Sequence, residues 1–212
     1  MLLRDEREAL CAHARRMRAE GLAEGTSGNL SVRAEDLVAV TPTGVPYEQL
    51  DAASICLVGL DGRQVDGAGA PSTELPMHLA VYSSTGAAAV VHTHSAWATA
   101  VSMVADELPA AHYMLTFVGG AVRVAPYATP GTEELGKRML AALGDRSAVL
   151  LGNHGAVTVG PSLERAWWYA TIVEWVAAVW SRAKLLGEPR LLTGEELDRV
   201  SQALAGYGPR PG

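Results

Sequence analysis

Residues 87–94 read Ala-Ala-Ala-Val-Val-His-Thr-His, an apolar run that ends in two histidines separated by one residue. A short apolar run of this length predicts a buried β-strand. Side chains alternate between the two faces of a strand, so His92 and His94 project to the same side. Two adjacent imidazoles are a common pair of ligands for one metal ion. The alternative is a pair of hydrogen-bonded histidines in the core.

Helices and short strands are predicted on both sides of this segment. Apolar periodicity, caps and turn residues predict helices over residues 3–20, 72–84, 96–104, 132–143 and 162–186, with a last helix opening at the capping box 193–196. Strands are predicted over residues 30–33, 37–40, 55–59, 122–124, 148–151 and 156–159, with a hairpin turn at 61–62. Residues 63–70 are polar and glycine-rich, which predicts a loop. Without an internal repeat or linker, one mixed α/β domain over residues 1–212 is expected.

Composition narrows the class of protein. The chain has 212 residues, of which 49% are hydrophobic and 19% charged, as in ordinary globular domains. Its formal net charge of −6 argues against nucleic acid as a main partner. No apolar run approaches the ~20 residues of a membrane span, and the charged N-terminus does not resemble a signal peptide. Cys11 and Cys56 lie in apolar segments without ligand spacing, so buried thiols and a cytoplasmic location are expected.

The scarcity of lysine excludes one class of enzyme. The chain contains only Lys137 and Lys184, each on a predicted amphipathic helix beside polar neighbours. A Schiff-base enzyme needs a lysine in an apolar pocket, where burial lowers the pKa of its amine. Neither lysine fits that description.

Two further residues extend the histidine pair into a candidate metal site. His154 lies in the turn Gly-Asn-His-Gly (152–155) between two predicted strands, where glycine keeps an imidazole accessible. Glu74 follows Ser72, a predicted N-cap, and is expected in the first turn of its helix. Three histidines and a carboxylate fit a catalytic Zn²⁺ with an exchangeable position.

Each of these residues also has an ordinary explanation. A lone histidine in a turn is often only a turn residue, and the helix macrodipole alone favours an acidic residue such as Glu74 in a first turn. A glutamate near a divalent cation can also leave the metal and act as a base. His78, one helical turn after Glu74, is expected to orient that carboxylate or simply to pack.

Three small-residue segments predict an anion site. Each offers backbone N–H groups with short hydroxyl or amide side chains, and together they are Gly28-Asn29, Thr43-Gly44 and Ser72-Thr73. The third opens a helix, and helix N-termini bind phosphate without any nearby cationic side chain. Taken singly, each segment is a turn or a cap. Together with a metal cluster they favour a phosphorylated substrate.

The order of these motifs resembles the class II aldolase/adducin family. The similarity is carried by residues 25–33, 41–48, 71–74, 92–94, 112–114, 125–135, 153–155 and 207–210, and it covers nearly the whole chain. Within the family the chain is most similar to aldolases of the L-fuculose-1-phosphate type. The resemblance implies a central, mostly antiparallel β-sheet flanked by helices on both faces.

The same resemblance implies a site and a reaction. One Zn²⁺ per subunit would bind His92, His94, His154 and Glu74, and the phosphate would lie on the three anion segments. Members of this type cleave a ketose 1-phosphate into dihydroxyacetone phosphate and an aldehyde through a metal-stabilised enediolate. Glu74 would carry the proton at the dihydroxyacetone phosphate carbon. Tyr113 of a neighbouring subunit would exchange a proton with the aldehyde oxygen, which implies a homotetramer.

The aldehyde end is where the chain departs from its relative. Pro130 stands where the related aldolase carries an aromatic residue, and Asn153 stands where it has histidine. Tyr207 is expected to help close the aldehyde side. The resemblance therefore predicts the reaction type more firmly than the sugar.

Several alternatives share the same residues. A pentulose-phosphate 4-epimerase would use the same metal chemistry, although such relatives tend to carry aspartate at the position of Glu74. A 5-deoxyribulose-phosphate aldolase would suit the altered pocket, and other members are dehydratases or decarboxylases. An adducin-like scaffold without catalysis is the non-enzymatic alternative, and scaffolds of that kind can lose the metal ligands.

Overall fold

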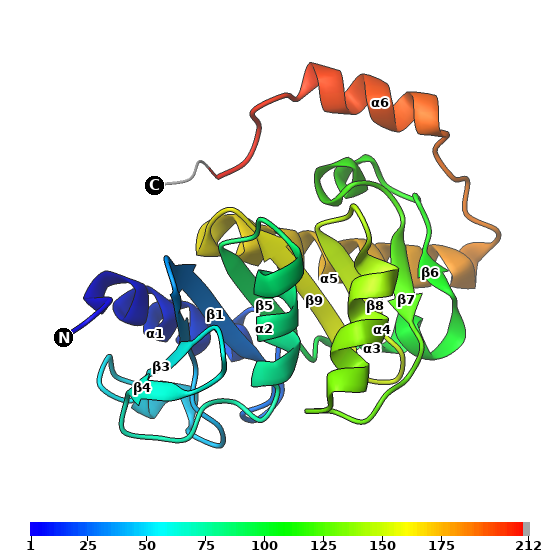
Figure 1. Ribbon diagram of the computed structural model, residues 1–212. Coiled ribbons are helices and arrows are strands. Elements are labelled where there is room, and N and C mark those ends of the chain that lie inside the picture. The colour runs from blue at the N-terminus through cyan, green and yellow to red at the C-terminus, as the bar shows by residue number, and fades with distance from the viewer. Residues whose placement is uncertain (210–212) are drawn as a thin grey trace.

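A single mixed sheet forms the centre of the computed structural model, which describes residues 1–209 (Figure 1). Within these residues nine strands are arranged in the order β4-β3-β2-β1-β5-β9-β8-β7-β6. Their bounds are β1 (Asn29–Ala34), β2 (Leu37–Val40), β3 (Cys56–Gly59), β4 (Gln64–Asp66), β5 (Ala89–Thr93), β6 (Glu107–Leu108), β7 (Val122–Ala125), β8 (Ala148–Leu151) and β9 (Gly155–Gly160). Every neighbouring pair is antiparallel except β7 and β8. The predicted α/β class and mostly antiparallel sheet are confirmed.

Helices cover both faces of this sheet (Figure 1). One face carries α1 (Arg4–Ala19), α3 (Ala96–Val104) and α5 (Leu163–Leu186), and the opposite face carries α2 (Leu75–Ser84) and α4 (Glu133–Leu143). Alternation along β5 sends Ala89 and Val91 into the core under α1 and α5, whereas Val90 enters the core under α2 and α4. His92 has the same parity as Val90, so it projects toward α2.

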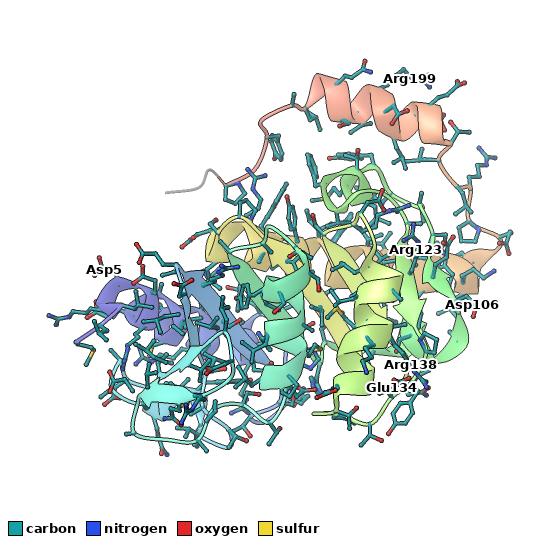
Figure 2. All side chains as sticks on the ribbon, viewed as in Figure 1. Asp5, Asp106, Arg123, Glu134, Arg138 and Arg199 are labelled. Atoms are coloured by element: carbon teal, nitrogen blue, oxygen red, sulfur yellow. The ribbon has the colours of Figure 1, made fainter. Side chains whose placement is uncertain are left out.

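The remaining elements lie at the edge of the molecule. Two 3-10 helices are present, η1 (Tyr47–Gln49) and η2 (Tyr113–Val118), and α6 (Gly194–Ala203) has no buried residue. Figure 1 shows α6 outside the body of the sheet, beyond η2. Figure 2 shows the charged side chains of Asp5, Asp106 and Arg199 around the periphery. None of the helices among residues 1–209 is both long and apolar enough to span a bilayer.

The loop predicted over residues 63–70 is partly wrong, because it contains β4. This strand lies at the edge of the sheet and its three residues are exposed, so no apolar alternation reveals it. The buried guanidinium of Arg7 pairs with Asp66 and donates to the carbonyl of Ala52, which fixes the edge. The short strand β6 and both 3-10 helices also lack a periodic signal.

The predicted start of α2 is wrong by about one turn. The helix begins at Leu75, and Glu74 is its N-cap rather than a residue of the first turn. The backbone N–H of Glu74 donates to Ser72 Oγ at 3.2 Å, so Ser72 caps the turn that precedes the helix. As predicted, Cys11 and Cys56 are buried free thiols.

Candidate metal centre and adjoining pocket

Four side chains from three parts of the fold converge on one point. His92 lies at the end of β5 and His94 just after it, His154 lies in the turn between β8 and β9, and Glu74 occupies the N-cap position of α2. One ligand atom from each lies within 4.8 Å of all the others. His92 Nε2 is 3.0 Å from both His94 Nε2 and Glu74 Oε2, and His154 Nε2 is 3.3 Å from Glu74 Oε1. His94 is half-buried, whereas the other three are buried.

Backbone contacts set the directions of these side chains. The N–H of His94 donates to the carbonyl of Leu22 at 3.0 Å, which fixes the chain just after β5. A Cβ on Gly155 would lie 2.1 Å from the carbonyl oxygen of Thr93, so only glycine lets the start of β9 approach β5 this closely. His154 is therefore held beside the histidine pair by the glycine that follows it.

The proton of His92 is placed so that its other ring nitrogen can face a cation. His92 Nδ1 lies 3.0 Å from the carbonyl oxygen of Ala156, and a carbonyl can only accept, so Nδ1 carries the proton. Nε2 then faces the carboxylate oxygen of Glu74 at 3.0 Å, and these two atoms need a cation or a shared proton between them. Burial, helped by the neighbouring His92, lowers the pKa of His94 and of His154 to about 4.

The carboxylate completes a donor set that fits a divalent metal. Burial acts to raise the pKa of Glu74, but His92, Asn29 and His154 together hold it well below its usual value. Among the described residues, the buried atoms Glu74 Oε1 and His154 Nδ1 have no hydrogen-bond partner. Three imidazoles and one ionised carboxylate fit Zn²⁺ or a similar cation.

A pocket of about 270 Å³ adjoins this cluster. The three segments predicted to bind an anion all line it, and the full lining is Thr26, Ser27, Gly28, Asn29, Pro42, Thr43, Gly44, Ser72, Thr73, Glu74, His94, Pro130 and His154. Gly28 has a φ of +84° and a Cβ there would lie 2.9 Å from the carbonyl oxygen of His92, so this loop requires glycine. The hydroxyl of Tyr47 donates to the carbonyl of Ser27 and steadies the same loop.

The residues predicted for the aldehyde end are not brought together within one chain. Pro130 lines the pocket, but Tyr113 and Tyr207 do not. Tyr113 lies in η2 with 44% of its surface exposed. Tyr207 is 58% exposed and its ring stacks on Phe117, with 5.7 Å between centroids. Their contribution to a site stays a prediction.

Sequence reasoning missed part of the surroundings of Glu74. His78 does not contact the carboxylate directly: its Nε2 lies 2.5 Å from Asn29 Oδ1, and Asn29 Nδ2 donates to Glu74 Oε2 at 3.0 Å. Ser31 and Tyr82 continue these contacts on the far side of His78. The sequence does contain one indication of these contacts: Glu74, His78 and Tyr82 are four residues apart on a predicted helix and therefore share one of its faces.

The chain is similar to known proteins in both sequence and fold. The family model "Class II Aldolase and Adducin N-terminal domain" matches residues 8–181. A 5-deoxy-D-ribulose 1-phosphate aldolase of Bacillus thuringiensis serovar kurstaki is 38% identical over 98% of this chain and 99% of its own length. The L-fuculose phosphate aldolase of Escherichia coli K12 is 40% identical over 90% of this chain and 89% of its own. A solved L-fuculose 1-phosphate aldolase structure superposes with a TM-score of 0.92, at 35% identity and with 96% and 97% of the two chains covered.

Proposed function

The chain belongs to the class II aldolase and adducin family, and from this premise we propose that it is a metal-dependent aldehyde-lyase. The proposed reaction is the reversible cleavage of a ketose 1-phosphate into dihydroxyacetone phosphate and an aldehyde. One observation carries the proposal: Glu74, His94 and His154 belong both to the metal cluster and to the wall of the pocket. A substrate in that pocket therefore lies against the metal ligands.

The proposed metal is one Zn²⁺ per subunit, held by Glu74, His92, His94 and His154. When bound, such a cation supplies a Lewis acid that offsets the negative charge developing on the substrate's carbonyl and adjacent hydroxyl oxygens. The chain itself supplies the proton carrier. Among residues 1–209 Glu74 Oε1 has no hydrogen-bond partner, and it faces His154, so this oxygen is placed to move a proton at carbon 3 of the substrate.

Neutral groups are proposed to hold the phosphate. The described residues that line the pocket include no lysine or arginine. Backbone N–H groups and the side chains of Asn29, Thr43 and Ser72 are the donors available there, and oriented amides bind anions without a cationic side chain. This arrangement lets a chain with a formal net charge of −6 accept a sugar phosphate.

A neighbouring subunit is proposed to complete the aldehyde end. Tyr113 and Tyr207 are exposed and outside the pocket of their own chain. We propose a cytoplasmic homotetramer in which Tyr113 reaches an adjacent site and exchanges a proton with the aldehyde oxygen, while Tyr207 helps to close it. A chain that is monomeric by light scattering and yet fully active would contradict this part.

The leading substrate is of the L-fuculose 1-phosphate type. A 5-deoxyribulose 1-phosphate is the second candidate, favoured by the near-complete overlap with the Bacillus relative and by the non-aromatic Pro130 in the pocket wall. Cleavage of either deoxy sugar releases a short aldehyde that ends in a methyl group. The two aldehydes differ by one hydroxyl-bearing carbon, so the pocket must discriminate only there.

A coupled assay for dihydroxyacetone phosphate tests the reaction and the sugar together. Zinc-loaded protein is incubated with a panel that contains both deoxyketose 1-phosphates and their fully hydroxylated counterparts. Release of dihydroxyacetone phosphate from the deoxy sugars is expected, and a metal chelator should abolish it. Failure with every ketose 1-phosphate would favour the epimerase or dehydratase alternatives.

A further inference from the structure

Five polar side chains form an uninterrupted row between β1 and α2. The polar row consists, in spatial order, of Glu74, Asn29, His78, Ser31 and Tyr82, and none of these residues is more than 6% exposed. The four links measure 3.0 Å from Asn29 Nδ2 to Glu74 Oε2, 2.5 Å from His78 Nε2 to Asn29 Oδ1, 2.6 Å from Ser31 Oγ to His78 Nδ1, and 2.7 Å from Ser31 Oγ to Tyr82 Oη. The apolar core of α2, β2 and β3 surrounds the Tyr82 end.

The row exists because two periodicities match. Glu74, His78 and Tyr82 are four residues apart and share one face of α2, whereas Asn29 and Ser31 are two apart and share one face of β1. Four helical residues rise about 6 Å and two strand residues about 6.6 Å, so groups from the two elements can alternate. The row is thus built into the packing of α2 on β1.

Every hydrogen bond in the row has a fixed direction. An ionised Glu74 can only accept, so Asn29 must turn its amide N–H₂ toward Glu74 and its carbonyl oxygen toward His78. His78 must then donate from Nε2. A neutral imidazole has one N–H, so Nδ1 accepts from Ser31, and the Ser31 oxygen accepts in turn from the hydroxyl of Tyr82.

The neutral state of His78 agrees with its surroundings. The side chain is fully buried, and burial, together with the nearby His92, lowers the pKa of His78 to about 3. At neutral pH the ring therefore carries a single proton. The opposite tautomer would place the Nε2 lone pair against Asn29 Oδ1 and turn the Asn29 amide around, so that two acceptors would meet at Glu74.

We propose that His78 is a positioning residue, which as the Nε2–H tautomer locks the Asn29 amide and thereby holds Oε2 of the Glu74 carboxylate. With Oε2 held, Oε1 stays directed at His154 and the pocket. The inference rests on the proposed function in taking Glu74 as both metal ligand and proton carrier. His78 itself does not line the pocket, so it acts through Asn29.

A purely structural role for the row predicts a different outcome. Loss of any buried hydrogen bond destabilises the fold, because the group left behind is unsatisfied. Thr158 offers a matched control: it is fully buried, and its Oγ1 donates to the carbonyl of Ala166 at 2.7 Å, under α5 on the opposite face of the sheet. Thr158→Val should lower the melting temperature without changing the position of the Glu74 carboxylate.

The first experiment compares three variants of the zinc-loaded, full-length protein. His78→Phe should lower kcat by ~10–100-fold, with KM changing less, and should weaken Zn²⁺ binding in a chelator competition, as changes behind a metal ligand typically do. His78→Gln, which keeps a donor and an acceptor, should recover part of both. Thr158→Val should keep kcat within about twofold, since its lost bond belongs to fold stability alone. Equal losses of stability in His78→Phe and Thr158→Val, with kcat and zinc affinity preserved in both, would overturn the proposal.

The second experiment observes the tautomer directly. Long-range ¹H–¹⁵N NMR of the unsubstituted, zinc-loaded protein should show a protonated Nε2 and a bare Nδ1 on His78. A protonated Nδ1, or a mixture of tautomers, would overturn the proposal whatever the variants do. Because this spectrum and the zinc affinities need no turnover, they decide the role of His78 even if no ketose 1-phosphate is cleaved. If His78→Phe fails to fold, the spectrum and the zinc affinity of His78→Gln, compared with Thr158→Val, take its place.

Discussion

The candidate metal centre and the proposed aldehyde end of the site are built in opposite ways. At the metal centre, Glu74, His92 and His154 are buried, and backbone and side-chain contacts within one chain hold Glu74 and His92. At the aldehyde end, only Pro130 lines the pocket, whereas Tyr113 and Tyr207 are exposed on a 3-10 helix and near the C-terminus. The difference predicts that the groups proposed to break the bond are held rigidly, whereas substrate choice depends on exposed segments.

Removing one metal ligand tests the rigid end most severely. His94→Ala should lose the bound zinc and at least ~10³-fold in turnover, since the proposed Lewis acid goes with it. Elemental analysis of purified protein should give about one Zn²⁺ per unsubstituted chain and a large deficit in the variant. A fully active protein without any metal would remove the metal centre from the proposal.

The next largest loss of turnover is expected when the proton carrier is removed but the metal stays bound. Glu74→Gln should keep zinc on the three histidines and lose ~10²–10⁴-fold in kcat, the usual range for a lost general acid or base. Zinc content and kcat measured on the same preparation distinguish the two roles. Near-normal turnover would show that Glu74 is not the proton carrier.

A substitution at the proposed aldehyde end should change the selectivity between substrates more than the rate of turnover. Pro130→Phe introduces the aromatic side chain that the family resemblance predicts at this position, and it should narrow the pocket that Pro130 lines. The ratio of kcat/KM for the six-carbon and five-carbon deoxyketose 1-phosphates should change by about tenfold. This is the discrimination that a pocket typically achieves between substrates that differ by one small group. Zinc content should stay the same. An unchanged ratio would place selectivity elsewhere.

The last test measures stability rather than turnover, through the pH dependence that the buried His78 should cause. The pKa of His78 is about 3 in the folded protein and ~6.5 when unfolded, so below pH 6.5 the unfolded chain binds a proton that the native ring does not. The free energy of unfolding therefore falls as pH decreases from about 6.5 toward 3, by up to ~1.4 kcal/mol per pH unit from this group. Urea unfolding of the unsubstituted protein and of His78→Gln should differ by that slope. Parallel curves would contradict a neutral, buried His78.

The convergence of the metal cluster was predictable because it depends on local rules. A strand with period two places His92 and His94 together, and a glycine-flanked turn exposes His154. Ser72 also proved to be a cap, although for the turn before α2. These features need only a few residues on either side, which the sequence contains.

What could not be predicted depends on contacts between distant segments. Ser31 and Tyr82 look like ordinary strand and helix residues until α2 packs on β1. The edge strand β4 shows no alternation because both of its sides are exposed. The roles proposed for Tyr113 and Tyr207 depend on a neighbouring subunit, so no local pattern in one chain predicts them.

The matched rise of α2 and β1 has a consequence for how this segment tolerates insertions and deletions. One residue added to β1 between Asn29 and Ser31 would send the second of them to the opposite face of the sheet. One residue added to α2 between Glu74 and Tyr82 would rotate the later positions by about 100° around the helix. A substitution in these segments removes single contacts of the polar row, whereas a change of length displaces every contact beyond the insertion or deletion. We therefore expect the lengths of residues 29–31 and 74–82 to be invariant in any functional variant of this fold.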